Sequence, residues 1–240
     1  MPHSALIHSL PPLGFIAVDV HFHRPPGDPF NALTWPFPLI KEQAEGSKLG
    51  QIVTKDSYPE GFLDRFVEAG QRLASKGCVG IITSCGFLAM AQPVLASRLP
   101  IPVATSALIQ IPSIRSFLPP QKSIGVITYD GTRLGPLHLS QLGISAEGIY
   151  IVGAPDDGYL RGVIRDGREY VHDEIEAELV RCAKELVEAH SDVGAIVLEC
   201  TQMPPFAMAI QQAVGLPIHD VYTMGKWFYS GLVRRDEWPT

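Results

Sequence analysis

Two cysteines stand at matching points of a repeated pattern in this 240-residue sequence. The segments 80–85 (GIITSC) and 195–200 (AIVLEC) align without gaps at an offset of 115 residues, so that Cys85 pairs with Cys200. The alignment resumes at two proline-containing segments, 99–103 (LPIPV) and 214–218 (VGLPI). Because each cysteine follows an apolar run that predicts a buried strand, each half of the chain places one thiol at the carboxyl end of a strand.

Thiols in these positions can act as an acid and a base on a small ligand. Ligands of open α/β sheets bind at the carboxyl edge of the strands, so two halves packed about a pseudo-twofold axis would make Cys85 and Cys200 face each other across one cleft. A helix that begins after each cysteine is expected to lower the thiol pKa from about 8.5 toward neutrality. One thiol can then remove a proton next to a carboxylate or imide carbonyl, and the other can return a proton on the opposite face. This chemistry requires no cofactor.

The elements that position these cysteines alternate between strands and helices. Apolar runs predict strands at 14–20, 51–54, 78–83, 102–105, 123–128, 194–198 and 217–220. Helical spacing of apolar residues predicts helices over 60–76, 87–97 and 168–190, and a final helix follows residue 220. This alternation is typical of parallel sheets covered on both faces. We predict an α/β fold of two Rossmann-like domains, 1–112 plus 222–240 and 113–221, with the active site in the cleft between them.

Composition excludes several classes of protein. Hydrophobic residues make up 46% of the chain and charged residues 18%, which excludes disordered and fibrous proteins. The net charge is −6, and no basic run or long apolar run occurs, so we expect neither a nucleic-acid nor a membrane partner. Four cysteines without a CxxC pair favour a cytoplasmic protein over a disulfide scaffold. His21 and His23 could bind a metal, but no third ligand is evident, so we predict no metal site.

Other polar residues near the same sheet edge are candidates for binding a small-molecule substrate. Asn31 lies in the proline-rich segment 25–38, which follows the first strand and is expected to cover the mouth of the cleft. Because this loop leaves the same sheet edge as the cysteines, His23, Arg24 or Asn31 could contact substrate; the alternative is that His23 and Arg24 are solvated loop residues. Thr128 and Thr132 follow the first strand of the second half and can hold a carboxylate, or they can simply stabilise a turn. Glu199 adjoins the second cysteine and is expected either to tune its pKa or to face solvent.

Three segments resemble a known family. The segments 84–89 (SCGFLA) and 199–207 (ECTQMPPFA) resemble the paired cysteine motifs of the aspartate/glutamate/hydantoin racemase superfamily. Residues 124–132 (IGVITYDGT) resemble the strand and turn that open the second domain of that family. The resemblance covers most of the chain, and it implies two domains related by a pseudo-dyad, racemisation without a cofactor, and a homodimer or higher homo-oligomer.

The resemblance also implies roles for individual residues. Cys85 and Cys200 would be the acid/base thiols, and Thr201 would bind the substrate carboxylate. Many amino-acid racemases carry Cys-Asn-Thr at the first motif, whereas this chain has Gly86 and Phe87 after its cysteine. The loss of two polar anchors favours a bulkier, less polar or cyclic substrate over aspartate or glutamate.

We therefore predict an isomerase, a cofactor-independent racemase or epimerase acting on an amino acid, a hydantoin or a related compound. Ser84, Gly86 and Phe87 are expected on one wall of the site, and Thr201 and Gln202 on the other. The alternatives are a cis–trans isomerase of an unsaturated diacid, a decarboxylase on the same fold, and a non-catalytic binder of small molecules.

Overall fold

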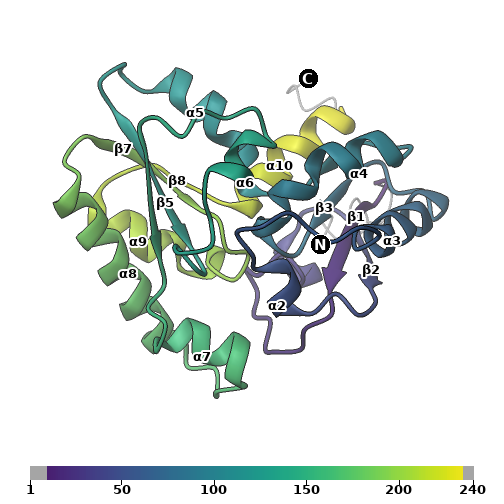
Figure 1. The fold of residues 1–240 in the computed structure, drawn as a ribbon, viewed down its shortest axis with the longest axis horizontal. Coiled ribbons are helices and arrows are strands. Elements are labelled where there is room, and N and C mark those ends of the chain that lie inside the picture. The colour runs from purple at the N-terminus through teal and green to yellow at the C-terminus, as the bar shows by residue number, and fades with distance from the viewer. Residues whose placement is uncertain (1–9, 235–240) are drawn as a thin grey trace, which may run out of the picture.

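Two four-stranded parallel sheets form the framework of the computed structural model, which describes residues 10–234 (Figure 1). The first sheet has the order β2-β1-β3-β4 and contains β1 (Leu13–Val18), β2 (Leu39–Ala44), β3 (Ile81–Thr83) and β4 (Val103–Ala104). The second has the order β6-β5-β7-β8 and contains β5 (Ser123–Thr128), β6 (Ile149–Gly153), β7 (Val193–Leu198) and β8 (Ile218–His219). The strand order is the same in both sheets, and the predicted α/β fold with two parallel sheets is confirmed.

Helices flank both sheets. The first half contains the α-helices α2 (Leu49–Ile52), α3 (Asp64–Ser75), α4 (Gln92–Arg98) and α5 (Ile111–Phe117), and the 3₁₀ helices η1 (Ala32–Thr34), η2 (Gly86–Ala91) and η3 (Ala107–Gln110). The second half contains α6 (Pro136–Ser140), α7 (Tyr159–Asp166), α8 (His172–Ala189), η4 (Pro204–Phe206) and α9 (Ala207–Val214), and α10 (Val221–Leu232) follows β8. In Figure 1, α8 and α9 lie on the outer side of the second sheet, and α7 lies below α8 at the bottom of the view. No helix of the described residues is long and apolar enough to cross a bilayer.

The helix α3 shows how the sequence determines these elements. Phe66, Ala69 and Leu73 recur at helical spacing, and all three are fully buried against the first sheet. Gly77 follows the helix with a φ of +81°, a left-handed conformation that glycine adopts without steric cost. The periodicity and the glycine together explain why the predicted helix is present, although it begins at Asp64 rather than at residue 60.

The last helix returns to the first sheet. Val221, Met224 and Tyr229 of α10 are buried in one apolar cluster with Leu13 and Phe15 of β1. A second, larger cluster contains buried side chains from both sheets, so the halves share a continuous core. The predicted domain boundaries extend into residues 1–9 and 235–240, which lie outside the described residues.

Four predictions of local structure are wrong or incomplete. The strand predicted at 51–54 is instead the end of α2 and the bend after it, because a short apolar run cannot distinguish a strand from a helical turn. The edge strands β2 and β6 were not predicted, and both are only partly buried. Charged residues interrupt the apolar pattern of β2, whereas β6 (IYIVG) is a short apolar run that the sequence analysis did not assign. The helix predicted at 168–190 starts at His172, and the separate helix α7 precedes it. The helix predicted at 87–97 is divided between η2 and α4.

Candidate active site

The two cysteines of the repeat line one narrow cavity between the halves of the molecule. Cys85 follows β3 and Cys200 follows β7, so both thiols stand beyond the carboxyl ends of central strands. The cavity has a volume of about 20 Å³, enough for one water molecule. Its other lining residues come from both halves: Leu49, Val53, Ser84, Gly86, Phe87, Tyr129, Ile164, Glu199, Thr201 and Gln202. The repeat therefore correctly indicates that the thiols share a cavity.

Burial controls the electrostatics of both thiols. It raises the pKa of Cys85 to about 12, with a further contribution from the negative charge of Glu199. The backbone N–H groups of Phe87 and Leu88 and the charge of Arg24 act in the opposite direction, because they stabilise the thiolate. Burial and Glu199 also raise the pKa of Cys200 well above its ordinary value. The prediction that helix N-termini bring the thiol pKa toward neutrality is therefore wrong for both cysteines.

Glu199 is a buried carboxyl group beside the thiols. Its side chain is almost inaccessible to solvent, and its Oε2 accepts a 2.5 Å hydrogen bond from the hydroxyl of Thr128. Its Oε1 has no hydrogen-bond partner among the described residues. Burial raises the pKa of Glu199 to about 7, although the Thr128 hydroxyl and the Tyr129 N–H favour the carboxylate. The sequence predicts that Glu199 either tunes the pKa of Cys200 or faces solvent, and the structure excludes the second alternative.

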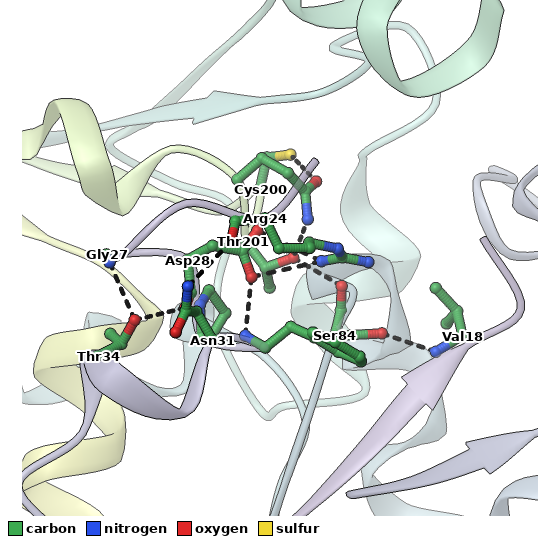
Figure 2. A network of polar contacts seen from close by, with 12 residues as sticks. Val18, Arg24, Gly27, Asp28, Asn31, Thr34, Ser84, Cys200 and Thr201 are labelled. Atoms are coloured by element: carbon green, nitrogen blue, oxygen red, sulfur yellow. Dashed lines mark hydrogen bonds and ion pairs between the residues drawn. The ribbon is translucent and has the colours of Figure 1, made fainter. Parts of the chain in front are cut away.

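A buried arginine brings positive charge to the site. The Arg24 side chain is 9% exposed, and its Nη1 lies 3.4 and 3.5 Å from the carboxylate oxygens of Asp28, which is 1% exposed. The guanidinium also lies over the ring of Phe22, 3.9 Å from its centroid. Figure 2 shows Arg24 and Asp28 beside Thr201 and Ser84. Because the contact with Asp28 is long, the guanidinium keeps donors that can bind an anionic ligand.

Side chains after Cys200 form a chain of hydrogen bonds that crosses between the halves. The Cys200 thiol donates to Oε1 of Gln202 at 3.2 Å, and Nε2 of Gln202 donates to the Thr201 hydroxyl at 2.8 Å. That hydroxyl donates to the carbonyl oxygen of Ser84 at 2.6 Å (Figure 2). The Ser84 hydroxyl in turn accepts a 2.8 Å bond from the N–H of Val18. Thr201 and Ser84 thus hold the second cysteine loop against the first sheet.

Three predicted substrate-binding residues form hydrogen bonds with nearby protein groups and are not among the residues that line this cavity. The Asn31 amide accepts from the N–H of Leu33 at 3.0 Å and donates to the carbonyl of Arg24 at 3.0 Å, so it shapes the loop that carries Arg24. Thr128 bonds to Glu199, as described above. The Thr132 hydroxyl donates to Oδ1 of Asp130 at 2.6 Å, as in a turn.

The sequence predicts Arg24 as one candidate substrate contact of the loop after the first strand, but Asp28 is not among its predicted site residues. Both residues lie in or beside a proline-rich loop, where the spacing of apolar residues does not show whether a side chain points toward the core or toward solvent. The sequence signal for Arg24 is the position of a charged residue a few residues after the first strand, near the sheet edge that carries the cysteines. Within the described residues, no group of three or more potential metal ligands occurs.

The chain is similar in sequence to lyases. It is 29% identical to a dimethylsulfoniopropionate lyase of Durusdinium sp. clade D over 228 residues, which cover 92% of this chain and 75% of that protein. It is 28% identical to dimethylsulfoniopropionate lyase 7 of Emiliania huxleyi over 237 residues, which cover 95% of this chain and 69% of that protein. The sequence matches no protein-family model.

Solved structures confirm the resemblance to the aspartate/glutamate/hydantoin racemase superfamily at the level of the fold. An arylmalonate decarboxylase superposes with a TM-score of 0.58 at 15% identity, covering 92% of both chains. Allantoin racemase from Pseudomonas fluorescens gives 0.58 at 16% identity, covering 92% of this chain and 91% of that one. Glutamate racemase from Francisella tularensis gives 0.52 at 16% identity, covering 95% and 84%. These relatives support an enzyme, and they include lyases and a decarboxylase as well as isomerases.

Proposed function

We propose that this chain, which has the fold of the aspartate/glutamate/hydantoin racemase superfamily, is a cofactor-independent lyase that removes a proton next to a carboxylate and eliminates a group from the neighbouring carbon. The observation that carries the proposal is that Cys85 and Cys200 line one buried cavity and that the charge of Arg24 interacts with both thiols. The sequence similarity to dimethylsulfoniopropionate lyases supplies the candidate substrate.

Arg24 is proposed to bind the carboxylate of the substrate. Its guanidinium is buried, its contact with Asp28 is long, and its charge interacts with both thiols. A carboxylate bound there would present its α-carbon to the cysteines. As a proton leaves that carbon, negative charge develops on the carboxylate oxygens, and the guanidinium stabilises it together with the N–H groups at the start of η2.

The proposed chemical step uses one thiolate as the base. With dimethylsulfoniopropionate, the sulfur of the cysteine takes the α-proton, and the electrons of the C–H bond form the carbon–carbon double bond. The C–S bond to the β-carbon breaks, and its electron pair leaves with the sulfur. The products are acrylate and neutral dimethyl sulfide, and the cysteine retains the proton. The apolar side chains of Leu49, Val53 and Phe87 on the cavity wall suit such an apolar leaving group.

Racemisation or epimerisation is the second candidate, and the pair of thiols favours it. Elimination needs one base, whereas inversion needs an acid and a base on opposite faces of one carbon. Cys85 and Cys200 stand at equivalent strand ends of the two sheets, as that reaction requires. A decarboxylase would use the same stabilised carbanion.

Product analysis distinguishes these reactions. The purified protein is incubated in D₂O with dimethylsulfoniopropionate, and in parallel with amino acids, 5-substituted hydantoins and an arylmalonate. The proposal predicts dimethyl sulfide in the headspace and acrylate in solution in equimolar amounts. It is wrong if dimethylsulfoniopropionate is untouched while deuterium enters the α-position of another substrate with inversion, or while carbon dioxide is released.

Variants of the proposed carboxylate ligand add a second test. Arg24→Gln removes the charge, and we expect KM for dimethylsulfoniopropionate to rise by about 10–100-fold, since hydrogen bonds to charged groups contribute about 1.5–3 kcal/mol. Arg24→Lys keeps the charge and should retain part of the affinity. An unchanged KM in Arg24→Gln would exclude this residue from substrate binding.

A further inference from the structure

The unpartnered oxygen of Glu199 lies where the two cysteine loops touch. A β-carbon built on Gly86 would lie 2.2 Å from Oε1 of Glu199 and 2.4 Å from its carbonyl oxygen. The residue that follows Cys85 is therefore in direct contact with the residue that precedes Cys200. One oxygen of this buried carboxyl group bonds to Thr128, and the other has no hydrogen-bond partner among the described residues. Such a group is costly to keep charged, which favours its protonated form.

Few charged or titratable groups face this carboxyl group. Tyr58, whose hydroxyl donates to the carbonyls of Ile52 and Phe87, interacts electrostatically with both Cys85 and Glu199. Tyr129 follows β5 and lines the cavity. The remaining groups in the surroundings are the Arg24–Asp28 pair and His138 of α6, whose ring packs edge-on against Phe87.

The two tyrosines and the histidine are each fixed in one protonation state near neutral pH. Burial raises the pKa of Tyr58 and Tyr129, so both remain protonated. Burial lowers the pKa of His138 to about 4, so its ring is neutral. Burial also raises the pKa of Asp28, and the charge of Arg24 opposes that shift. Among the titratable groups that line the cavity, proton exchange near pH 7 therefore involves Glu199 and the two thiols.

We propose that Glu199 and the two cysteines hold a single negative charge between them, so that Glu199 receives the proton when a thiol becomes a thiolate. The S–H bond of the cysteine breaks, its electron pair stays on the sulfur, and an O–H bond forms on the carboxyl group. Glu199 acts through the thiols and is a positioning residue for their proton. The proposal rests on the proposed use of the thiols as bases, but its test needs no substrate.

Sharing one charge makes the amount of thiolate independent of pH above neutrality. The first proton leaves mostly from Glu199, whose pKa is about 7. In a small, fixed fraction of the resulting molecules, the negative charge lies on a sulfur instead of on the carboxylate. Raising the pH further does not change this fraction until a second proton leaves. Loss of that second proton is opposed by repulsion between Glu199 and the thiolates, which is part of the reason that the thiol pKa values are high. Without the carboxyl group, the thiolate fraction would rise with each pH unit.

The test is the rate at which iodoacetamide alkylates each cysteine between pH 6 and 9.5, resolved by mass spectrometry of the peptides. In the native protein, we expect the rates at Cys85 and Cys200 to level off above about pH 7.5 and to change less than about twofold up to pH 9.5. In Glu199→Gln, which keeps the size of the side chain, the rates should continue to rise by about tenfold per pH unit, or about 100-fold over the same interval.

Two further variants complete the experiment. Glu178→Gln changes another buried glutamate, whose carboxylate accepts from the N–H groups of Tyr159 and Leu160, and it should leave the plateau in place. Thr128→Val removes the hydrogen bond that favours the Glu199 carboxylate, so the plateau should begin at higher pH, and this variant carries the test if Glu199→Gln does not fold.

Three results would overturn charge sharing. They are a native rate that rises throughout, a plateau that survives in Glu199→Gln, and an onset that does not move in Thr128→Val. None of these results bears on whether the protein releases dimethyl sulfide, so failure of this proposal is distinguishable from failure of the proposed lyase activity.

Discussion

The two cysteine loops occupy equivalent places in two sheets of identical strand order, yet they are built differently. At Cys85 the chain enters η2 at once, and backbone N–H groups approach the sulfur. At Cys200 the backbone N–H of Gln202 also approaches the sulfur, and side chains add a series of hydrogen bonds that link the thiol to Gln202, Thr201 and the opposite half. The repeated fold thus supplies the positions of the thiols, while the residues next to them determine how each one holds its proton.

Replacing each cysteine tests whether this difference has chemical consequences. Cys85→Ser and Cys200→Ser are the variants, and replacement of a cysteine that acts as an acid or a base should lower kcat/KM by about 10²–10⁴-fold, the usual contribution of such a group. If the protein is a lyase with one base, one variant should lose far more activity than the other, whereas a racemase should lose inversion in both. Cys78→Ser and Cys182→Ser are the controls, because these cysteines do not line the cavity. Full activity in both loop variants would remove the thiols from the mechanism.

The stability of the protein should reveal the raised pKa of Glu199. Since the pKa is about 7 in the folded state against an ordinary value of 4.5, the folded protein binds this proton more tightly than the unfolded chain does. The stabilisation is complete below about pH 4.5 and is lost as the pH rises through 7, by about 3 kcal/mol in total. Glu199→Gln lacks this contribution, so the difference in unfolding free energy between the two proteins should change over that range in urea titrations. A constant difference would mean that the carboxyl group has an ordinary pKa.

A methyl group at position 86 should disturb the loop that carries Cys85. Gly86→Ala places a β-carbon against the side chain and the carbonyl of Glu199, and we expect a loss of about 1–3 kcal/mol, as for other overpacked sites. Gly231→Ala in α10 is the matched control, because a β-carbon there would have no atom within 4 Å among the described residues, and it should be neutral or slightly stabilising. Equal stabilities of the two variants in thermal unfolding would show that the contact at Gly86 relaxes freely.

The smallest expected effect on stability concerns the loop that carries Cys200. Thr201→Val removes the hydroxyl that donates to Ser84 and accepts from Gln202, and it should destabilise the protein by about 1–2 kcal/mol because a buried carbonyl loses its partner. Thr201→Ser keeps the hydroxyl and should recover most of that stability. If Thr201→Val is as stable as the native protein while Thr201→Ser is destabilised in urea unfolding, the methyl group and not the hydrogen bond stabilises this position.

The sequence predicts the framework better than the environment of the thiols, for a physical reason. The central strands are continuous apolar runs, and the cysteines follow two of them, so the repeat is sufficient to bring Cys85 and Cys200 to one cavity. The edge strand β2 carries Lys41 and Glu42, which conceal it from a search for apolar runs. The direction of a pKa shift depends on burial in three dimensions, and no local spacing reveals that Glu199 is enclosed by the opposite half.

The contacts beneath the thiols also constrain how a ligand reaches them. The bond from Thr201 to Ser84 and the contact of Glu199 with Gly86 join the two halves, so the halves cannot separate at this point without breaking a buried hydrogen bond. The cavity has room for about one water molecule, so a larger ligand can bind only if segments that line the cavity move. One of these segments is α2 with the residue that follows it, Val53, whose carbonyl accepts a 2.7 Å hydrogen bond from Arg133 of the second half. A movement of α2 that widens the cavity therefore has to stretch or break a second bond between the halves.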